Sequence, residues 1–221
     1  MPDKKGNGLL MVWADVPADK EDDFNAWYNE EHIPELLAIP GILNAARYEA
    51  VKSGPRHLAC YELESVAVVE TEAFKNRPRS EWAQRASAPS IATTLISNVY
   101  QMIHPTELTP EIAGSDMAPA LQIGRMDVGP ENEDEWNRWY SGIYVPNYET
   151  VPGVIRGRRY KSVRGTPMYA TVYEFEHECV SESEEWDRQR DIDPSTERIR
   201  PMMTHATGSP GVWKKTFQIK D

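Results

Sequence analysis

The sequence predicts an α+β fold: two tandem ferredoxin-like (βαββαβ) domains whose sheets face each other as a barrel within one chain. Two observations carry this prediction, namely an internal repeat and the alternation of strand-like and helix-like segments within each copy. The chain has 221 residues, enough for one large or two small domains, and its 40% apolar content is enough for a core.

The internal repeat relates the two halves at an offset of 112 residues, without a gap over about fifty positions. The matched pairs include Phe24-Asn25-Ala26-Trp27-Tyr28 with Trp136-Asn137-Arg138-Trp139-Tyr140, Pro34 with Pro146, Pro40-Gly41 with Pro152-Gly153, Arg47-Tyr48 with Arg159-Tyr160, and Tyr61-Glu62 with Tyr173-Glu174. Near the ends, Val99-Tyr100 matches Val212-Trp213 at offset 113. We therefore expect a first domain at 1–108, a Pro- and Gly-containing linker at 109–117, and a second domain at 118–221.

Each copy contains four segments that we expect to be strands, because β-branched and aromatic residues are bounded there by turn residues. In the first copy these are Gly8–Val16, Ile42–Val51, His57–Ser65 and Asn98–His104. In a βαββαβ unit both helices cover one face of the sheet. The other face must also be buried, and the sheet of the second copy is at hand to cover it.

The first helix should begin with Asp19 as its N-cap, and the acidic residues 21–23 favour the positive end of the helix dipole. Pro34 lacks an N–H and clashes with the preceding turn, so we expect a bend there, and an equivalent bend at Pro146. Pro40-Gly41 ends the helix. The segment 66–85 should be mainly helical, with an interruption at Pro78.

Charge and composition exclude several classes of function. A net charge of −11 disfavours binding to nucleic acid or to an anionic membrane, because phosphates would be repelled. There is no apolar run of the ~20 residues that span a bilayer, and residues 1–8 lack the apolar core of a signal peptide. Cys60 and Cys179 are far apart and suit neither a disulfide framework nor a metal site, so a cytoplasmic protein without a metal is expected.

A candidate site lies on the first helix, where Tyr28 and His32 are four residues apart and therefore share a face, with Phe24 one turn earlier. A neutral imidazole beside a phenol is a competent proton-transfer pair near pH 7, and Trp27 would supply an apolar wall. The alternative is a structural histidine that is hydrogen-bonded to a strand. The spacing does not decide between the two.

The second copy differs at this point. Tyr144 stands where the first copy has His32, so Trp136, Tyr140 and Tyr144 form the equivalent stripe without a histidine. Two equivalent sites are therefore not expected.

The second strand of each copy carries a candidate ligand for a carboxylate or an oxyanion, Arg47 in the first copy and Arg159 in the second. The alternative, which we favour from the sequence, is a salt bridge to a neighbouring acid such as Glu62 or Glu174. Tyr61 and Tyr173 are expected to lie in the core or on a pocket wall.

The string Trp27-Tyr28-Asn29-Glu30-Glu31-His32-Ile33-Pro34-Glu35, followed by Ile39-Pro40-Gly41 and Arg47-Tyr48, resembles the signature of EthD-like proteins of the dimeric α+β barrel superfamily. The resemblance covers most of each copy and is strongest at residues 24–64. It implies a pocket between the first helix and the sheet. It also favours a functional His32 over a structural one. Many proteins of this superfamily work without a metal or an organic cofactor.

Three functions follow from this resemblance. The first is a cofactor-independent lyase, isomerase or cyclase that acts on a small apolar or aromatic substrate, with His32 and Tyr28 as catalytic residues. Its substrate-binding residues are expected to be Phe24, Trp27, Arg47, Tyr61, Tyr140 and Tyr144. The second is a small monooxygenase or haem-type oxygen-using enzyme of the same fold, and the third is a non-catalytic binding protein. A homodimer of the tandem chain is also compatible with the resemblance.

Overall fold

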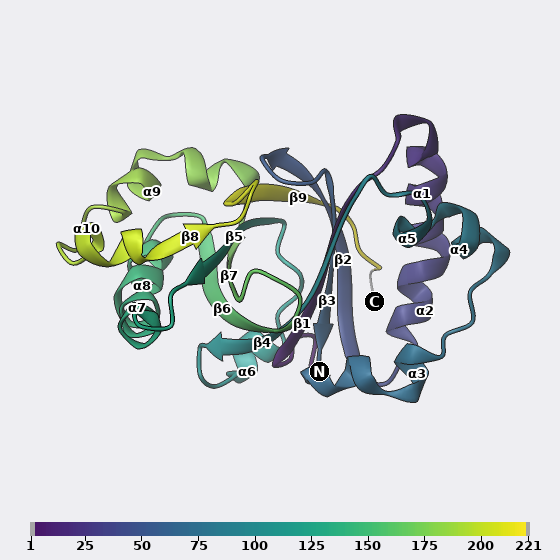
Figure 1. Ribbon diagram of the computed structural model, residues 1–221, viewed down its shortest axis with the longest axis horizontal. Coiled ribbons are helices and arrows are strands. Elements are labelled where there is room, and N and C mark those ends of the chain that lie inside the picture. The colour runs from purple at the N-terminus through teal and green to yellow at the C-terminus, as the bar shows by residue number, and fades with distance from the viewer. Residues whose placement is uncertain (1–2, 220–221) are drawn as a thin grey trace.

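Within residues 3–219, which the computed structural model describes, nine β-strands form one antiparallel sheet, and eight of them close into a barrel (Figure 1). The order around the barrel is β7-β6-β4-β1-β3-β2-β9-β5, and β5 pairs with β7 to complete the ring. The short strand β8 pairs with the end of β5 that β9 does not reach. Helices cover the barrel from two opposite sides (Figure 1).

The first half of the chain contributes four strands to one side of the barrel. Its elements are β1 (Gly8–Asp15), η1 (Ala18–Lys20), α1 (Glu21–Trp27), η2 (Tyr28–His32), α2 (Ile33–Leu37), β2 (Ile42–Lys52), β3 (His57–Leu63), η3 (Val66–Glu70), α3 (Glu72–Lys75), α4 (Glu81–Ala86), α5 (Ala88–Ile91) and β4 (Thr94–His104). These strands lie in the order β4-β1-β3-β2.

The second half contributes the other side of the barrel. Its elements are α6 (Pro110–Ala113), β5 (Ala120–Val128), α7 (Glu133–Trp139), η4 (Tyr140–Tyr144), α8 (Val145–Glu149), β6 (Val154–Arg164), β7 (Tyr169–Phe175), η5 (Glu178–Glu182), α9 (Glu184–Gln189), α10 (Thr196–Ile199), η6 (Arg200–Met202), β8 (Met203–His205) and β9 (Gly211–Phe217). Residues 1–2 and 220–221 of the predicted domains lie outside the described residues.

The two halves meet along two seams of the barrel, β2 with β9 and β4 with β6. Strand register is the same in both halves once the offset is applied. Leu10 lies opposite Tyr61 and Gln122 opposite Tyr173, and both second strands carry a register irregularity at the equivalent place, after Ile42 and after Val154.

A cluster of buried charges lies inside the barrel, among otherwise apolar side chains. The Arg158 guanidinium contacts the carboxylates of Glu62 at 2.5 Å and Glu174 at 2.8 Å, and the Lys5 ammonium contacts the same two carboxylates at 3.6 and 3.1 Å. All four side chains are at most 3% exposed. Charges this deeply buried are tolerated only when they are paired, and here Lys5 and Arg158 face both carboxylates, with Arg156 as a third cation 3.5 Å from Glu174.

Some sequence expectations about local structure are wrong. Asp19 does not cap the first helix, because it lies in the 3₁₀ turn η1 and α1 starts after Lys20 without a side-chain cap. The strand expected from Asn98 already begins at Thr94, where it pairs with the end of β1. The segment 109–117 holds the helical turn α6, to which the backbone N–H groups of Lys4 and Lys5 donate at the Ala113 carbonyl.

The prolines of the first helices also act differently from the expectation of a bend. The backbone stays helical through Pro34, but residues Tyr28–His32 form a π turn in which the Ile33 N–H donates to the Tyr28 carbonyl. In a regular α-helix the Pro34 ring would clash with the carbonyl of Glu30, four residues earlier. The wider π turn leaves room for that carbonyl. The same π turn, Tyr140–Tyr144, precedes Pro146. No helix within residues 3–219 is long and apolar enough to cross a membrane.

Candidate functional site

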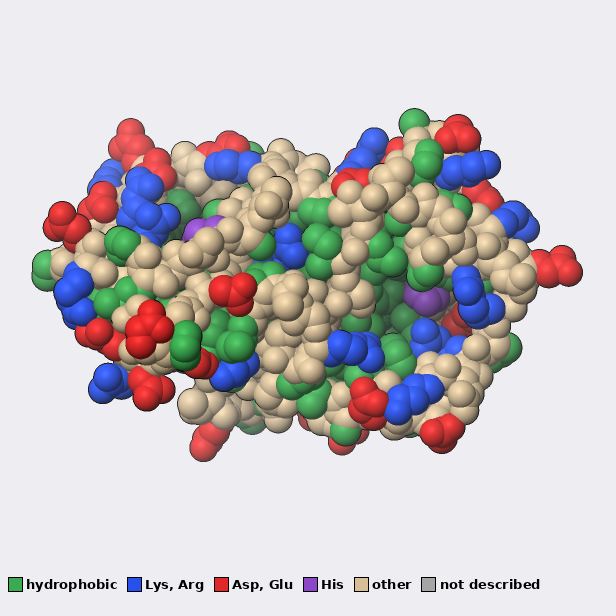
Figure 2. Space-filling view, in the orientation of Figure 1, with side chains coloured by type: hydrophobic (Ala, Val, Ile, Leu, Met, Phe, Trp, Pro, Cys, Tyr) green, Lys and Arg blue, Asp and Glu red, His purple; other side chains and the backbone are tan. Residues whose placement is uncertain are grey.

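A cavity of about 380 Å³ lies in the first half, between the first helix and the outer face of β1, β3 and β4. Figure 2 shows this region as a hollow with apolar side chains on its floor and Lys and Arg side chains at its rim. Trp27, Tyr28, His32 and Tyr61 line it. The structure therefore brings both predicted catalytic residues and two of the predicted substrate-binding residues to one cavity.

The π turn places Tyr28 and His32 on the cavity wall. Their rings meet edge to face with centroids 5.0 Å apart, while the Trp27 ring stacks on His32 at 4.4 Å with an interplanar angle of 23°. An ordinary α-helix would bring residues 28 and 32 together, but residues 27 and 32 meet because the widened turn contains one more residue.

The His32 imidazole is neutral. Burial lowers its pKa to about 3, and the nearby cations Arg77 and Arg47 act in the same direction. No side chain or backbone group among the described residues hydrogen-bonds either ring nitrogen. The ring therefore has a free lone pair for a molecule in the cavity, whereas a purely structural histidine would be bonded to a strand.

The carboxylate of Glu31, the residue before His32, is held by two hydrogen bonds. The same oxygen, Oε1, accepts both bonds, from Trp27 Nε1 at 2.8 Å and from Ser80 Oγ at 2.5 Å. These bonds fix the indole that supports His32, and they tie the first helix to α4. Glu31 thus positions the wall of the cavity.

Two cations at the cavity were not singled out from the sequence. Arg77 donates to the Phe74 carbonyl and lies over the Phe74 ring at 4.2 Å, while Arg79 donates to Ser87 Oγ at 3.0 Å. They flank Pro78, the residue that interrupts the second helical segment. The Arg-Pro-Arg string was a usable signal, because a proline break turns its neighbours out of a regular helix.

Glu35 is the acidic group on the cavity wall. Burial raises its pKa, the neighbouring Glu31 raises it further, and Arg77 opposes both. A carboxyl group with a raised pKa and a neutral imidazole on the wall of one cavity are groups that can take part in proton exchange.

Phe24 and Arg47 lie behind Tyr28, away from the cavity. The Arg47 guanidinium stacks over the Tyr28 ring at 4.7 Å and donates to Asn25 Oδ1 at 2.6 Å and to Asn29 Oδ1 at 3.0 Å. It therefore holds the helix against the sheet, and it does not reach a ligand in the cavity.

The prediction of a salt bridge between Arg47 and Glu62 is wrong. Arg47 lies opposite Ala59 in the sheet and Glu62 opposite Asn44, so the two side chains point to opposite faces. Glu62 pairs instead with Arg158, the residue before Arg159. Arg159 repeats the role of Arg47 in the second half, where it donates to Asn137 Oδ1 at 2.8 Å and to Ser141 Oγ at 2.7 Å.

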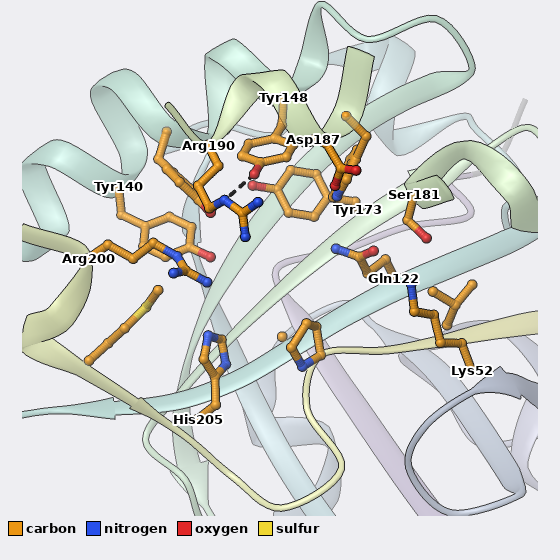
Figure 3. Close-up of a pocket in the computed structure, with 16 residues that line it drawn as sticks. Lys52, Gln122, Tyr140, Tyr148, Tyr173, Ser181, Asp187, Arg190, Arg200 and His205 are labelled. Carbon is orange, nitrogen blue, oxygen red and sulfur yellow. Dashed lines mark hydrogen bonds between the residues drawn. The ribbon is translucent and has the colours of Figure 1, made fainter. Parts of the chain in front are cut away.

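Tyr140 and Tyr144 lie far from this cavity, in a second cavity of about 260 Å³ in the second half (Figure 3). Tyr144 takes the place of His32, and its hydroxyl donates to that of Tyr148 at 3.3 Å. Tyr173, the counterpart of Tyr61, and His205 from β8 also line it. The two halves thus carry separate cavities with different chemistry. Among the described residues, no group of three His, Cys, Asp or Glu side chains is placed to hold a metal ion.

No family model matches the sequence, and no curated protein matches it. The fold, in contrast, matches solved structures over nearly its whole length. An anthrone oxidase-like protein is 14% identical, with 98% of this chain and 94% of that chain covered and a TM-score of 0.63. A monooxygenase-like protein from Fusobacterium nucleatum is 12% identical, with 98% and 99% covered and a TM-score of 0.56.

A haem-binding protein from Thermus thermophilus is 13% identical, with 96% of this chain and 92% of that chain covered and a TM-score of 0.51. Chlorite dismutases have similar structures as well. These proteins share the dimeric α+β barrel fold. This chain has the same class of fold, closed within one polypeptide. At such identities the likeness shows the fold alone.

Proposed function

We propose that this protein is a cofactor-independent oxygen-using enzyme that oxidises a small aromatic substrate in the first-half cavity, with His32 as the general base. The observation that supports this most is the His32 ring itself, which is neutral, free of hydrogen bonds within the described residues, and stacked on Trp27 at the cavity wall. The aromatic wall favours a flat substrate.

Oxidation is favoured over the lyase or isomerase activity that the sequence first indicated. Similar structures are described as oxidase-like, monooxygenase-like and chlorite dismutase-like, and lyase or isomerase activity finds no support among them. Proton abstraction by His32 is common to both functions. Removal of the proton leaves a carbanion of the substrate. In the proposed reaction, this carbanion reacts with O₂.

Haem, which one of the similar proteins binds, does not fit either of the two cavities described above. The second cavity, about 260 Å³, is below the ~300–1,000 Å³ typical of pockets for drug-sized ligands, and a haem is larger than such a ligand. The first cavity, about 380 Å³, is at the low end of that range.

The proposed reaction converts a benzylic CH₂ group, made acidic by conjugated rings, into a ketone. His32 takes one proton, and the carbanion that remains transfers its electrons to O₂ as a C–O bond forms. The proton returns to give a hydroperoxide. Loss of the second C–H proton and cleavage of the O–O bond then release water, so that R₂CH₂ and O₂ become R₂C=O and H₂O.

The surrounding side chains suit this sequence of steps. The Arg77 and Arg79 cations at the cavity would stabilise the negative charge of the carbanion. That negative charge would also raise the proton affinity of His32 at the moment when it must hold a proton. Burial raises the pKa of the phenol of Tyr28, so Tyr28 would stay protonated and could donate a hydrogen bond to the oxygen of the substrate.

Oxygen consumption with anthrone as the probe substrate tests the proposal. Wild-type protein should consume one O₂ for each anthrone oxidised, and His32→Ala should lower kcat by ~10²–10⁴-fold, the usual contribution of a general base. Tyr144→Phe, which changes the equivalent position of the second half, is the matched control and should keep most of the activity. Equal activity of His32→Ala and wild type would refute the assignment of His32.

We also propose that the chain arose by duplication of one ferredoxin-like domain, at 1–108 and 118–221, of the EthD-like branch. The shared strand register and the paired π turns support this reading. So does the offset of 113 at the last strand, since Val99 lies opposite Leu10 and Val212 opposite Gln122. Homodimerisation of the chain stays a prediction.

A further inference from the structure

The second cavity differs from the first in the polar groups that face it. Arg190 follows α9, Arg200 lies on η6 and His205 on β8, and Figure 3 shows these three side chains converging on the same space. Lys52 from β2 adds a further cation, and Asp187 is the single acid on the wall. A surplus of positive charge here stands out in a chain whose net charge is −11.

The Arg200 guanidinium has no hydrogen bond or ion pair with any residue between 3 and 219, and its Nε is buried. Arg190, in comparison, has an acidic neighbour, Asp191, at 3.9 Å. Guanidinium groups that are withdrawn from water normally have a carboxylate or carbonyl partner. The Arg200 guanidinium is therefore available to bind an anion in the cavity.

Two hydroxyl groups on the cavity wall also lack partners. The Tyr173 side chain is 3% exposed and that of Ser181 6% exposed, yet neither hydroxyl has a hydrogen-bond partner within the described part of the chain. Both residues line the cavity, on β7 and η5 (Figure 3). A buried hydroxyl without a partner costs free energy, so these two groups are placed to bond a polar molecule in the cavity.

Aromatic rings form the remaining wall. The Tyr148 ring packs on Trp186 at 4.3 Å and on Tyr173 at 5.5 Å, and Tyr144 continues this row. Ring edges of this kind favour a flat apolar body beside the charged end of a ligand. The volume of about 260 Å³ suits a small ligand.

We infer that the second cavity is a binding site for a small aromatic carboxylate, whose carboxylate meets Arg200 and whose ring lies against the tyrosines. The Tyr173 hydroxyl would donate to the same carboxylate, while Ser181, which lies across the cavity from Arg200 (Figure 3), could bond a second polar group of the ligand. This site is separate from the His32 cavity and does not depend on the activity proposed for it.

Isothermal titration of the full chain with benzoate tests the inference. Benzoate should bind one site per chain, while benzamide, which has the same shape without the charge, should bind at least tenfold more weakly. Arg200→Gln should weaken benzoate binding by about 10- to 100-fold, because a hydrogen bond to a charged group is lost. Arg77→Gln, which removes a cation from the first cavity, is the matched control and should leave the affinity unchanged.

Tyr173→Phe keeps the ring and removes the hydroxyl, so it tests the site even if Arg200→Gln fails to fold. It should weaken benzoate binding by several-fold, to about tenfold. Absence of benzoate binding, or equal affinity for benzamide, would overturn the inference. So would binding that Arg77→Gln abolishes and Arg200→Gln leaves intact, because the ligand would then occupy the first cavity.

Discussion

Glu174→Gln in the centre of the barrel should lower the stability of the protein at neutral pH by roughly 3 kcal/mol. Burial alone would raise the pKa of Glu174, but Lys5 and Arg158 hold it at about 2, against an ordinary value of 4.5. At about 1.4 kcal/mol for each tenfold change, this depression corresponds to roughly 3 kcal/mol. Breaking a buried ion pair by removing one partner typically costs a similar ~3–5 kcal/mol.

The sign of the pH dependence follows from the direction of the shift. A carboxyl group whose pKa is lower in the folded state stabilises the protein above its unfolded pKa, and it loses that contribution as the pH falls. The stability gap between wild type and Glu174→Gln should therefore be full above about pH 5 and should shrink between pH 4.5 and about pH 2.

Urea unfolding followed by tryptophan fluorescence measures this gap at a series of pH values. Glu133→Gln is a suitable control, because Glu133 pairs with Lys161 at 2.7 Å near the surface and its loss should cost less than about 1 kcal/mol. A gap for Glu174→Gln that is the same at pH 3 and pH 7 would refute the reasoning, since the loss would then come from packing and not from charge.

Further predictions concern the site and the helix that carries it. If neutral His32 is the base, kcat/KM for anthrone should show no inflection near pH 6.5 and should fall only as the pH approaches about 3; a decline centred at pH 6.5 would contradict the burial of the ring. Arg47→Lys should lower the free energy of unfolding by about 1–3 kcal/mol, measured in urea, because an ammonium cannot bond Asn25 and Asn29 as a guanidinium does. Gly41→Ala should cost about 1–3 kcal/mol in the same assay, since Gly41 has a φ of +89° and a Cβ there would lie 2.6 Å from Val68; an unchanged melting curve would show that the loop can relax.

The barrel could be anticipated from the sequence because its signals are periodic and repeated. Each half shows the alternation of strand-like segments, and an ungapped repeat relates the two halves. Because the apolar face of each sheet must be covered, only a few arrangements of the two sheets are possible. The closed eight-stranded barrel is confirmed. Local backbone choices were harder: a proline marks where a regular helix fails, but it does not say whether the chain bends or widens to a π turn, as it does at Tyr28–His32.

The candidate site was partly predictable for a related reason. Helical spacing brings Tyr28 and His32 together whatever the rest of the chain does, and both line the cavity. Arg77 and Arg200, in contrast, lie on irregular segments whose side-chain directions follow from packing and not from spacing. The pairing of Arg158 with Glu62 was not predicted from the sequence. Neighbouring residues of a strand point to opposite faces of the sheet, so Arg158 points into the barrel with Glu62 while Arg159 points to the other face.

The two seams between the halves have a consequence for any attempt to divide the chain. The pairs β2–β9 and β4–β6 close the barrel, and β2 and β4 are each 11 residues long, so a separated first half would expose two long unpaired edges. Cutting the backbone at 109–117 would leave fragments that meet only by diffusion, whereas the tether keeps each half at a high effective concentration near the other. Co-expressed fragments should therefore reassemble in a concentration-dependent way, which makes this chain a natural scaffold for a split reporter.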